Sequence, residues 1–204
     1  MTFVETIKIE NSIVHNLDFH QERMWRTTLL HFGTKPEIRI DIAEIPLHLQ
    51  NDKIKCRVLY NAEILSVEFH AYQPKKIQSL QLVTDNEIEY THKSTDRNAL
   101  NKLFEQRKEA DDIIVIKNGF LTDSSFANLV FETHAGDPMC GSKLFTPKTP
   151  LLAGTKRAFL LKNGIVKGRE IAVEDLSSYK KVYLINAMID LEDDVSVFVD
   201  SVIL

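Results

Sequence analysis

The sequence predicts an α+β fold in which most strands are joined by short turns. Apolar and polar residues alternate in many short runs, and three longer segments show helical spacing instead. The turn signals between the runs are tight, and the clearest is the Asn118-Gly119 pair, which is typical of a β-hairpin. Strands that follow one another through short turns favour an α+β arrangement over a doubly wound parallel sheet.

The first half of the chain is predicted to begin with a hairpin and a helix. Residues 3–10 alternate between apolar and polar side chains, and Ile13-Val14 resume the pattern after a break, as hairpin partners do. Residues 19–32 show helical spacing, with Asp18 as a candidate N-cap and Gly33 as the stop signal. Three further strands are expected at residues 55–60, 63–70 and 79–84.

The second half is predicted to hold two more helices, several strands and one long loop. The helices are expected over residues 94–109 and from Leu151 to about Lys162. Residues 135–150 are rich in Gly and Pro and are expected to form the loop. The remaining strand candidates are residues 112–117, 120–121, 127–132, 166–172, 181–185 and 195–199.

Length and composition indicate a globular protein with two subdomains. The chain has 204 residues, of which 44% are hydrophobic and 26% charged, so it is able to bury a core. A boundary is expected in the loop after Thr84, which gives an N-terminal subdomain of residues 1–86 and a C-terminal subdomain of residues 87–204.

Charge, hydropathy and cysteine usage exclude several classes of protein. The net charge of -4 and the lack of a basic patch give no reason to expect nucleic acid. No apolar run approaches a membrane span, and the start lacks a signal-peptide pattern. Cys56 and Cys140 show no metal-ligand spacing and are expected to be reduced thiols, with one disulfide bridge as the alternative. We therefore expect a cytoplasmic protein without a metal.

Two ionisable residues stand out by their order and flanks. Lys93 lies just ahead of the second predicted helix, and Asp123 lies in the run from Leu121 to Asn128, where one strand ends and another begins. A lysine amine can condense with an aldehyde, and a carboxylate can pair with a ring nitrogen. Pyridoxal phosphate chemistry requires both groups.

The order of four segments resembles the class IV aminotransferases, the fold type IV pyridoxal phosphate enzymes. These segments fall in register over nearly the whole chain: His20-Gln21-Glu22-Arg23, Lys93, Thr122-Asp123 with Ala127-Asn128, and Gly154-Thr155. The family includes branched-chain aminotransferases, D-amino-acid aminotransferases and 4-amino-4-deoxychorismate lyases. The resemblance implies the two-subdomain architecture of the D-amino-acid aminotransferases and a homodimer.

Two features of the chain depart from the family pattern. Phe3-Val4-Glu5-Thr6 resembles a strand that usually follows an N-terminal strand and glycine-rich loop, so the chain is expected to lack that first segment. The residue at the ring-nitrogen position is usually glutamate, whereas this chain has Asp123. An aspartate can make the same ion pair, but its arm is shorter by one methylene.

The resemblance gives Lys93 and Asp123 the central roles. Lys93 is implied to bond to the cofactor aldehyde through its ε-amine and then to move the substrate proton, which requires a pKa lowered toward neutrality. Asp123 is implied to face the pyridine nitrogen, and Asn128 is similar to an asparagine that commonly follows in the family. Without the resemblance, Lys93 could equally be a surface lysine and Asp123 a turn residue. Asn128 could be an amide that forms hydrogen bonds with backbone groups.

Phosphate binding is implied for the first and third helices. Arg23 matches the family arginine that contacts the cofactor phosphate, although Arg26 lies nearby and a solvated helix arginine is the alternative. Gly154 and Thr155 are implied to present backbone N–H groups to the phosphate, because glycine permits close approach and the helix dipole favours an anion. A plain helix start is the alternative for this pair.

The last matching segment is Asn186-Ala187, which resembles the family's final active-site loop and most closely its lyase version. It is implied to contact phosphate or substrate, and a turn at a strand end is the alternative. His20 matches a family position but is expected to be a structural helix residue. His92 is not counted as catalytic, because adjacent side chains of an extended backbone point to opposite sides.

Together these segments imply a pyridoxal 5'-phosphate enzyme that acts on a small amine or amino acid. The Asn186-Ala187 loop and the Asp96-Arg97 continuation after Lys93 favour a 4-amino-4-deoxychorismate lyase, which releases pyruvate and 4-aminobenzoate in folate biosynthesis. One alternative is an aminotransferase for branched-chain or D-amino acids. A second is a non-catalytic relative that keeps the fold as a binding module.

Overall fold

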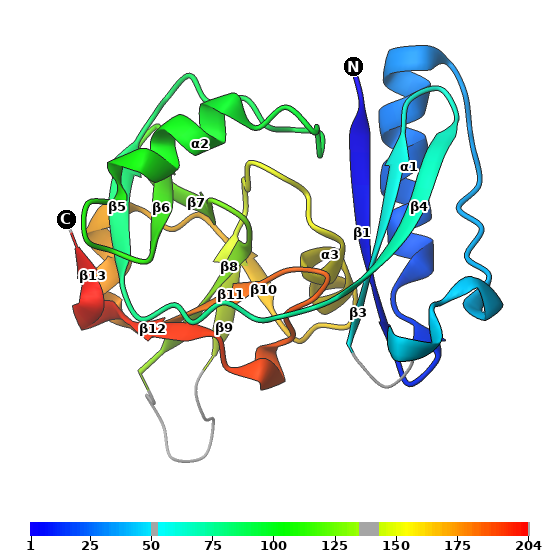
Figure 1. The fold of residues 1–204 in the computed structure, drawn as a ribbon. Helices are drawn as coiled ribbons and strands as arrows, with labels where there is room; N and C mark the ends of the chain where they lie inside the picture. Colours follow the sequence, from blue (N-terminus) through cyan, green and yellow to red (C-terminus); the bar gives the residue numbers. More distant parts are fainter. Residues whose placement is uncertain (50–52, 135–142, 204) are drawn as a thin grey trace. The chain divides into compact units, whose positions relative to one another are not determined.

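The computed structural model describes residues 1–49, 53–134 and 143–203, which form two compact units (Figure 1). Unit 1 comprises Met1–Pro74 and His92–Asp96, and unit 2 comprises Lys75–Thr91 and Arg97–Leu204. The expected boundary after residue 86 differs from this division. The reason is that the strand before it already pairs within unit 2, and a later short segment returns to unit 1.

Unit 1 contains an antiparallel sheet and one long helix, α1, which packs against the sheet (Figure 1). The sheet has four strands among the described residues, in the order β2-β1-β3-β4. The strands confirm the predicted hairpins and have these bounds: β1 Phe3–Glu10, β2 Ile13–Val14, β3 Ile54–Tyr60 and β4 Ile64–Ala71.

Helix α1 spans Leu17–Phe32 and ends as predicted at Gly33, whose positive φ of 70° is the left-handed conformation that glycine adopts without strain. The predicted N-cap at Asp18 is wrong, because Asn16 occupies the N-cap position, without a capping hydrogen bond from its side chain, and Asp18 lies in the first turn. There its charge complements the positive end of the helix dipole. Two short 3-10 turns follow, η1 at Ile42–Glu44 and η2 at Leu47–Leu49.

The core of unit 1 lies between α1 and one face of the sheet. Alternate residues of a strand share a face, so Phe3, Ile7 and Ile9 of β1 join Met24 of α1 in one buried cluster. The cluster also includes Ile54, Cys56, Val58 and Tyr60 of β3. Cys56 is a buried free thiol, as expected. Cys140 lies outside the described residues.

Unit 2 is built on a mixed sheet of nine strands among the described residues. Along the main path of the sheet the strand order is β10-β9-β8-β7-β6-β5-β13. Strand β11 lies off this path and pairs with both β8 and β12. The strands have these bounds: β5 Leu80–Thr84, β6 Asp112–Lys117, β7 Phe120–Ser124, β8 Asn128–Thr133, β9 Leu144–Pro147, β10 Lys167–Arg169, β11 Tyr179–Ile185, β12 Ser196–Phe198 and β13 Val202–Ile203.

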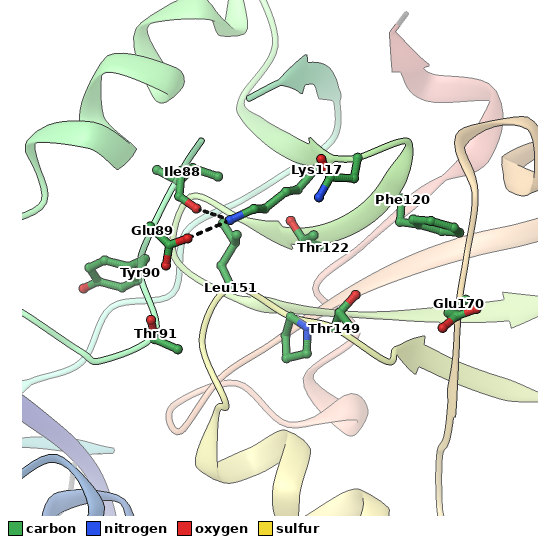
Figure 2. Close-up of a pocket in the computed structure, with 12 residues that line it drawn as sticks. Ile88, Glu89, Tyr90, Thr91, Lys117, Phe120, Thr122, Thr149, Leu151 and Glu170 are labelled. Atoms are coloured by element: carbon green, nitrogen blue, oxygen red, sulfur yellow. Dashed lines mark hydrogen bonds and ion pairs between the residues drawn. The ribbon is translucent and has the colours of Figure 1, made fainter. Parts of the chain in front are cut away.

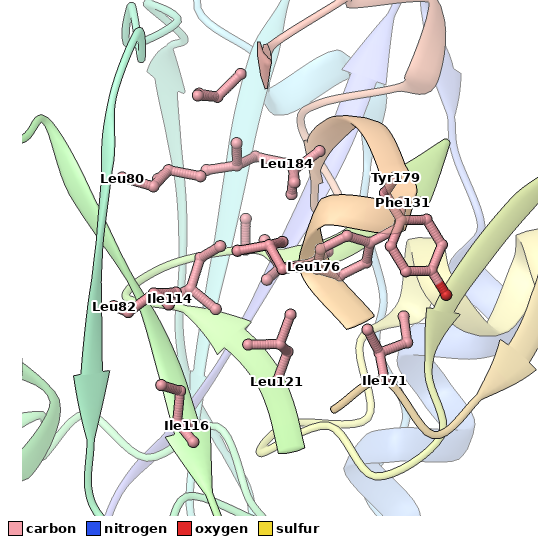
Figure 3. Close-up of a cluster of buried hydrophobic side chains, with 14 of the residues drawn as sticks. Leu80, Leu82, Ile114, Ile116, Leu121, Phe131, Ile171, Leu176, Tyr179 and Leu184 are labelled. Atoms are coloured by element: carbon pink, nitrogen blue, oxygen red, sulfur yellow. The ribbon is translucent and has the colours of Figure 1, made fainter. Parts of the chain in front are cut away.

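Apolar side chains cover both faces of the β5–β6 pair. On one face Leu80, Ile114, Phe131 and Leu184 belong to the main core, which Figure 3 shows together with Tyr179. On the other face two leucines of helix α2 pack against Ile113 and Val115. The helical segments of unit 2 are α2 Asn98–Phe104, η3 Glu105–Arg107, α3 Thr155–Lys162, η4 Val173–Ser178, η5 Leu191–Asp193 and η6 Val199–Ser201.

Several predicted bounds in the second half differ from the structure. The helix expected from residue 94 begins only at Asn98, because residues 93–95 pair with the edge of β1 instead. Strand β7 continues to Ser124, beyond the expected end at residue 121. The expected long loop contains β9, and β13 is an additional strand. Short strands of this kind carry too few residues to show an alternation.

The α+β class is confirmed, with strands joined mainly by hairpins and three parallel pairs among the described strands. Within residues 1–49, 53–134 and 143–203, none of the helices combines the length and apolar character that crossing a bilayer requires.

Candidate functional site

Lys93 lies in a short extended segment that pairs with the edge of β1. The Lys93 carbonyl oxygen accepts a hydrogen bond from the Val4 N–H at 3.0 Å, and Ser94 forms a bridge with Phe3. Thr95 donates its backbone N–H to the Thr2 carbonyl oxygen at 3.0 Å. These bonds fix the backbone on both sides of the partly buried Lys93.

The neighbouring His92 packs its ring against two aromatic rings of unit 1. The ring centroids of His92 and Phe3 are 6.2 Å apart, and those of His92 and His31 are 4.8 Å apart. Burial lowers the pKa of His92, and the charges of His31 and Arg26 lower it further. His92 therefore serves the packing of this segment against β1 and α1.

The other predicted residue of unit 1, Arg23, is buried in an ion-pair network rather than solvated. Its side chain donates two hydrogen bonds to Glu5 of β1, from Nε to Oε1 at 2.9 Å and from Nη2 to Oε2 at 2.5 Å. His20 Nδ1 lies 2.6 Å from Glu5 Oε2. All three residues are buried, and Glu5 is 0% exposed.

The pKa values of Glu5 and His20 are set by burial and by their contacts with each other and with Arg23. Burial by itself would raise the pKa of Glu5, but the Arg23 charge and the His20 hydrogen bond outweigh it and lower the pKa to about 2. Burial lowers the pKa of His20, and the charges of Arg23 and Lys93 lower it further. The hydrogen bond to Glu5 and the charge of Glu5 raise this pKa, but their effect is smaller. A neutral His20 therefore donates its Nδ1–H to an ionised Glu5.

Unit 2 carries a second buried carboxylate, that of Asp123 on β7. Asp123 Oδ1 accepts a hydrogen bond from Asn128 Nδ2 at 2.8 Å, and Oδ2 accepts one from the Leu152 N–H at 2.9 Å. Asn128 Nδ2 also donates to the Leu152 carbonyl oxygen at 2.9 Å. Burial raises the pKa of Asp123 to about 6, against these hydrogen bonds and the charge of Arg157.

Gly154 is required by the packing of Asn128. A Cβ atom at position 154 would lie 1.9 Å from Asn128 Oδ1, which no side chain could tolerate without a shift. Gly154 also serves as the N-cap of α3, and Thr155 follows as the buried first residue of that helix. The start of α3 and the carboxylate of Asp123 are thus held together through Asn128.

Asn186 and Ala187 follow β11 at the same end of the sheet. The register pairs Asn128 with both Asp123 and Ile185, so the residue after Ile185 lies close to the β7–β8 turn. Asn186 Nδ2 donates to the Phe126 carbonyl oxygen at 3.5 Å, and Asn186 Oδ1 accepts the Met188 N–H at 2.8 Å. The structure therefore brings the predicted residues of unit 2 together.

Sequence reasoning missed Glu5 and Leu152. For Glu5 a signal existed, because the alternation of β1 puts it on the same face as Phe3 and Ile7 and therefore in the core. Leu152 acts through its backbone N–H, which leaves no mark on the sequence.

A pocket lies beside the β6–β7 hairpin in unit 2, and Figure 2 shows it. Its volume is about 390 Å³, and Lys117 Nζ donates at its wall to the Ile88 carbonyl oxygen at 2.7 Å and to Glu89 at 3.1 Å. Thr122 and Leu151 line it, and each immediately precedes a residue of the Asp123 network. The pocket therefore borders the two segments that carry the Asp123 network.

Comparisons with known proteins identify the family of the chain. The family described as amino-transferase class IV matches residues 2–191. An uncharacterised protein of Haemophilus influenzae is 39% identical over 188 residues, which cover 90% of this chain and 96% of the relative.

Solved structures extend the likeness. A candidate 4-amino-4-deoxychorismate lyase from Haemophilus somnus is 34% identical with a TM-score of 0.78, and the match covers 92% of this chain and 96% of that one. A candidate amino-acid aminotransferase from Mesorhizobium loti shares the fold with a TM-score of 0.70 at 22% identity, over 91% and 94% of the two chains. The chain therefore belongs to the class IV aminotransferase family, whose members are pyridoxal phosphate-dependent enzymes.

Proposed function

We propose that the protein is a 4-amino-4-deoxychorismate lyase, which converts its substrate to 4-aminobenzoate and pyruvate. The observation that carries this proposal is the 34% identity to the candidate lyase from Haemophilus somnus over nearly the full length of both chains. The Asn186-Ala187 loop, which resembles that of the lyases, supports the same choice.

The buried groups of unit 2 fit the ring of pyridoxal 5'-phosphate. Asp123 is 4% exposed, and Asn128 and Leu152 donate to it as neutral groups, so its negative charge is stabilised by hydrogen bonds rather than by a contacting cation. A protonated ring nitrogen would supply that positive charge. When bound, the cofactor supplies an aldehyde that bonds amines and a ring that accepts electron density.

The proposed roles of the remaining residues follow from their charge and position. By the family resemblance, Arg23 would supply a positive charge to the phosphate group, and Gly154-Thr155 would supply backbone N–H donors at the start of α3. The Asn186-Ala187 turn would contact phosphate or substrate. Asp123 would hold the proton on the ring nitrogen.

Lys93 would move the proton of the reaction. Its amine would take the proton from the substrate ring carbon that bears the amino group. The bond from the ring to the enolpyruvyl oxygen would then break, and Lys93 would return the proton to the departing group as it becomes pyruvate. The two products together hold all atoms of the substrate, so neither water nor an oxidant is consumed. Formation of the aromatic ring favours the products.

The proposal is tested by supplying the purified, cofactor-loaded protein with 4-amino-4-deoxychorismate and measuring both products. Pyruvate and 4-aminobenzoate are expected in equal amounts. Lys93→Ala should abolish both, whereas Lys102→Ala, at an exposed lysine of α2, should leave the rate unchanged. Transfer of an amino group to a keto acid without pyruvate release would instead identify an aminotransferase. If Lys93→Ala keeps the visible absorbance of the wild type, the protein is a binding relative.

The proposal includes a homodimer in the cytoplasm, as in the family. Sedimentation equilibrium of the purified protein measures the first, and a mass of one chain would contradict it. Fractionation of cells that express the protein at its native level measures the second.

A further inference from the structure

Glu5 is a charged residue on the face of β1 that packs against α1. The neighbours on this face are Phe3, Ile7 and Ile9, all of them buried and apolar. A carboxylate in such a place is costly unless cations or N–H donors compensate it. Glu5 is compensated by two residues one helical turn apart, Arg23 and His20 of α1.

The contact between Glu5 and Arg23 fixes the orientation of the guanidinium group. The group is planar and carries five N–H donors, and Glu5 occupies the edge formed by Nε and Nη2. Two parallel bonds to one carboxylate allow a single arrangement of the plane. The Nη1 side of the guanidinium therefore faces away from Glu5.

We propose that Glu5 is a positioning residue for anion recognition by unit 1: its carboxylate orients Arg23 to bind a phosphate monoester and fixes the proton of His20 on Nδ1. This rests on the proposed function, in which Arg23 binds the cofactor phosphate. Lys93 lies close enough for its charge to act on His20, so the network and the predicted reactive amine share one electrostatic environment.

Two effects of Glu5 on anion binding have opposite signs. As a negative charge beside Arg23, Glu5 opposes the approach of a phosphate, so its removal would tighten binding if charge alone mattered. As the group that orients the guanidinium, it favours binding, so its removal would weaken it. The sign of the change therefore distinguishes a positioning residue from a simple countercharge.

The experiment measures binding of two probes to the cofactor-free, full-length protein by calorimetry. Pyridoxine 5'-phosphate carries the phosphate but no aldehyde, so Lys93 cannot bond to it, and pyridoxine lacks the phosphate as well. Glu5→Gln should weaken the phosphorylated probe by tenfold or more and leave the affinity for pyridoxine unchanged. Equal or tighter binding of the phosphorylated probe would overturn the proposal.

Glu68→Gln is the matched control. Glu68 of β4 also contacts an arginine and a histidine, Arg57 at 3.2 Å and His70 at 3.3 Å, but on the surface. This variant should bind both probes like the wild type. Glu5→Asp keeps the charge and shortens the arm, so it should also weaken the phosphorylated probe. Wild-type binding by Glu5→Asp would contradict positioning.

Two further measurements keep the proposal separate from the function on which it rests. Arg23→Gln should weaken the phosphorylated probe; if it does not, Arg23 is not the phosphate ligand and the positioning role of Glu5 is overturned, whereas the proposed lyase reaction stays open to its own test. Absence of lyase activity with normal probe behaviour would remove only the reaction. Should the Glu5 variants not fold, the Arg23 Nε–H resonance of the wild type decides. It should exchange slowly and shift with the phosphorylated probe alone, and an unchanged resonance would overturn the proposal.

Discussion

Each unit of the protein buries one carboxylate in its candidate site, and the two differ in their partners. Glu5 in unit 1 is 0% exposed and Asp123 in unit 2 is 4% exposed, so burial is nearly equal. The pKa of Glu5 is lowered to about 2, whereas that of Asp123 is raised to about 6. Arg23 and His20 bind the first, and neutral N–H groups bind the second.

This difference indicates which carboxylate has its charge compensated within the protein and which would gain from a cationic ligand. Glu5 has its counter-ion inside the protein, so its role is to hold the residues around it. Asp123 is ionised at neutral pH at a cost of about 3 kcal/mol relative to an exposed aspartate. A cationic group of a ligand would remove that cost. The Glu5 carboxylate therefore has a structural role, whereas the Asp123 carboxylate is suited to bind a cationic group of a ligand.

The largest effect is expected from neutralising Glu5. Glu5→Gln leaves the Arg23 charge buried without its partner, which should lower the free energy of unfolding by about 3–5 kcal/mol. Urea denaturation followed by circular dichroism measures the change. Glu68→Gln, which removes an exposed carboxylate with the same types of partner, should leave the urea midpoint unchanged. Equal effects of both variants would show that burial of the network contributes nothing.

The pH dependence of stability should separate the two carboxylates by sign. The pKa of Glu5 is lowered from 4.5 to about 2, so its stabilisation is complete above pH 4.5 and is lost as the pH falls through 2. The pKa of Asp123 is raised from 3.8 to about 6, so stability should fall as the pH rises from 3.8 through 6 in the cofactor-free protein. Each contribution is about 3 kcal/mol. Urea titrations across pH 2–8 measure both, and a profile that rises between pH 4 and 6 contradicts the assignment for Asp123.

A methyl group at position 154 should disturb the Asp123 network through Asn128. The added Cβ of Gly154→Ala would force Asn128 away from its contact at 1.9 Å, which should destabilise the protein by about 1–3 kcal/mol. The pKa of Asp123 should also rise, because the Asn128 hydrogen bond lowers it. Gly168→Ala is the control, because nothing lies within 4 Å of a Cβ there. An unchanged Asp123 titration in Gly154→Ala would contradict the coupling.

The smallest effect is expected from Asp123→Asn, and its sign is opposite to that of Glu5→Gln. The substitution removes the free-energy cost of burying the Asp123 charge. It also loses one of the two hydrogen bonds from N–H donors, because only one oxygen of the new amide group can accept. The net result should be a gain of about 1–2 kcal/mol in the cofactor-free protein at pH 8. The affinity for pyridoxal 5'-phosphate should fall at the same time. A loss of stability at pH 8 would contradict the view that this carboxylate awaits a cation.

Local patterns predicted most of the fold. Alternation identified β1, β3 and β4, and the Asn118-Gly119 pair marked the β6–β7 hairpin correctly. The pattern failed where pairing over a long sequence distance decides the conformation. Residues 94–97 have no helical structure because the edge of β1 binds this segment, and no local signal reports a partner ninety residues away.

For the candidate site, the resemblance selected the residues and the structure supplied their partners. Arg23 was identified, but the carboxylate that holds it was not, although the alternation of β1 already placed Glu5 among core residues. Glycine at position 154 was expected to admit a phosphate, whereas the structure gives it a second reason, the approach of Asn128. Contacts with a backbone N–H, such as that of Leu152, have no residue-type signature and cannot be predicted in this way.

The return of the chain from unit 2 to unit 1 over His92–Asp96 has a consequence for dissecting the protein. A fragment that stops at Pro74 would lose the strip that pairs with Thr2 and Val4, and would expose their hydrogen-bonding groups at a bare sheet edge. Bare edges recruit other chains, so such a fragment is expected to aggregate rather than stay in solution. Anyone who wishes to express the first unit alone would need to graft this five-residue strip back onto it.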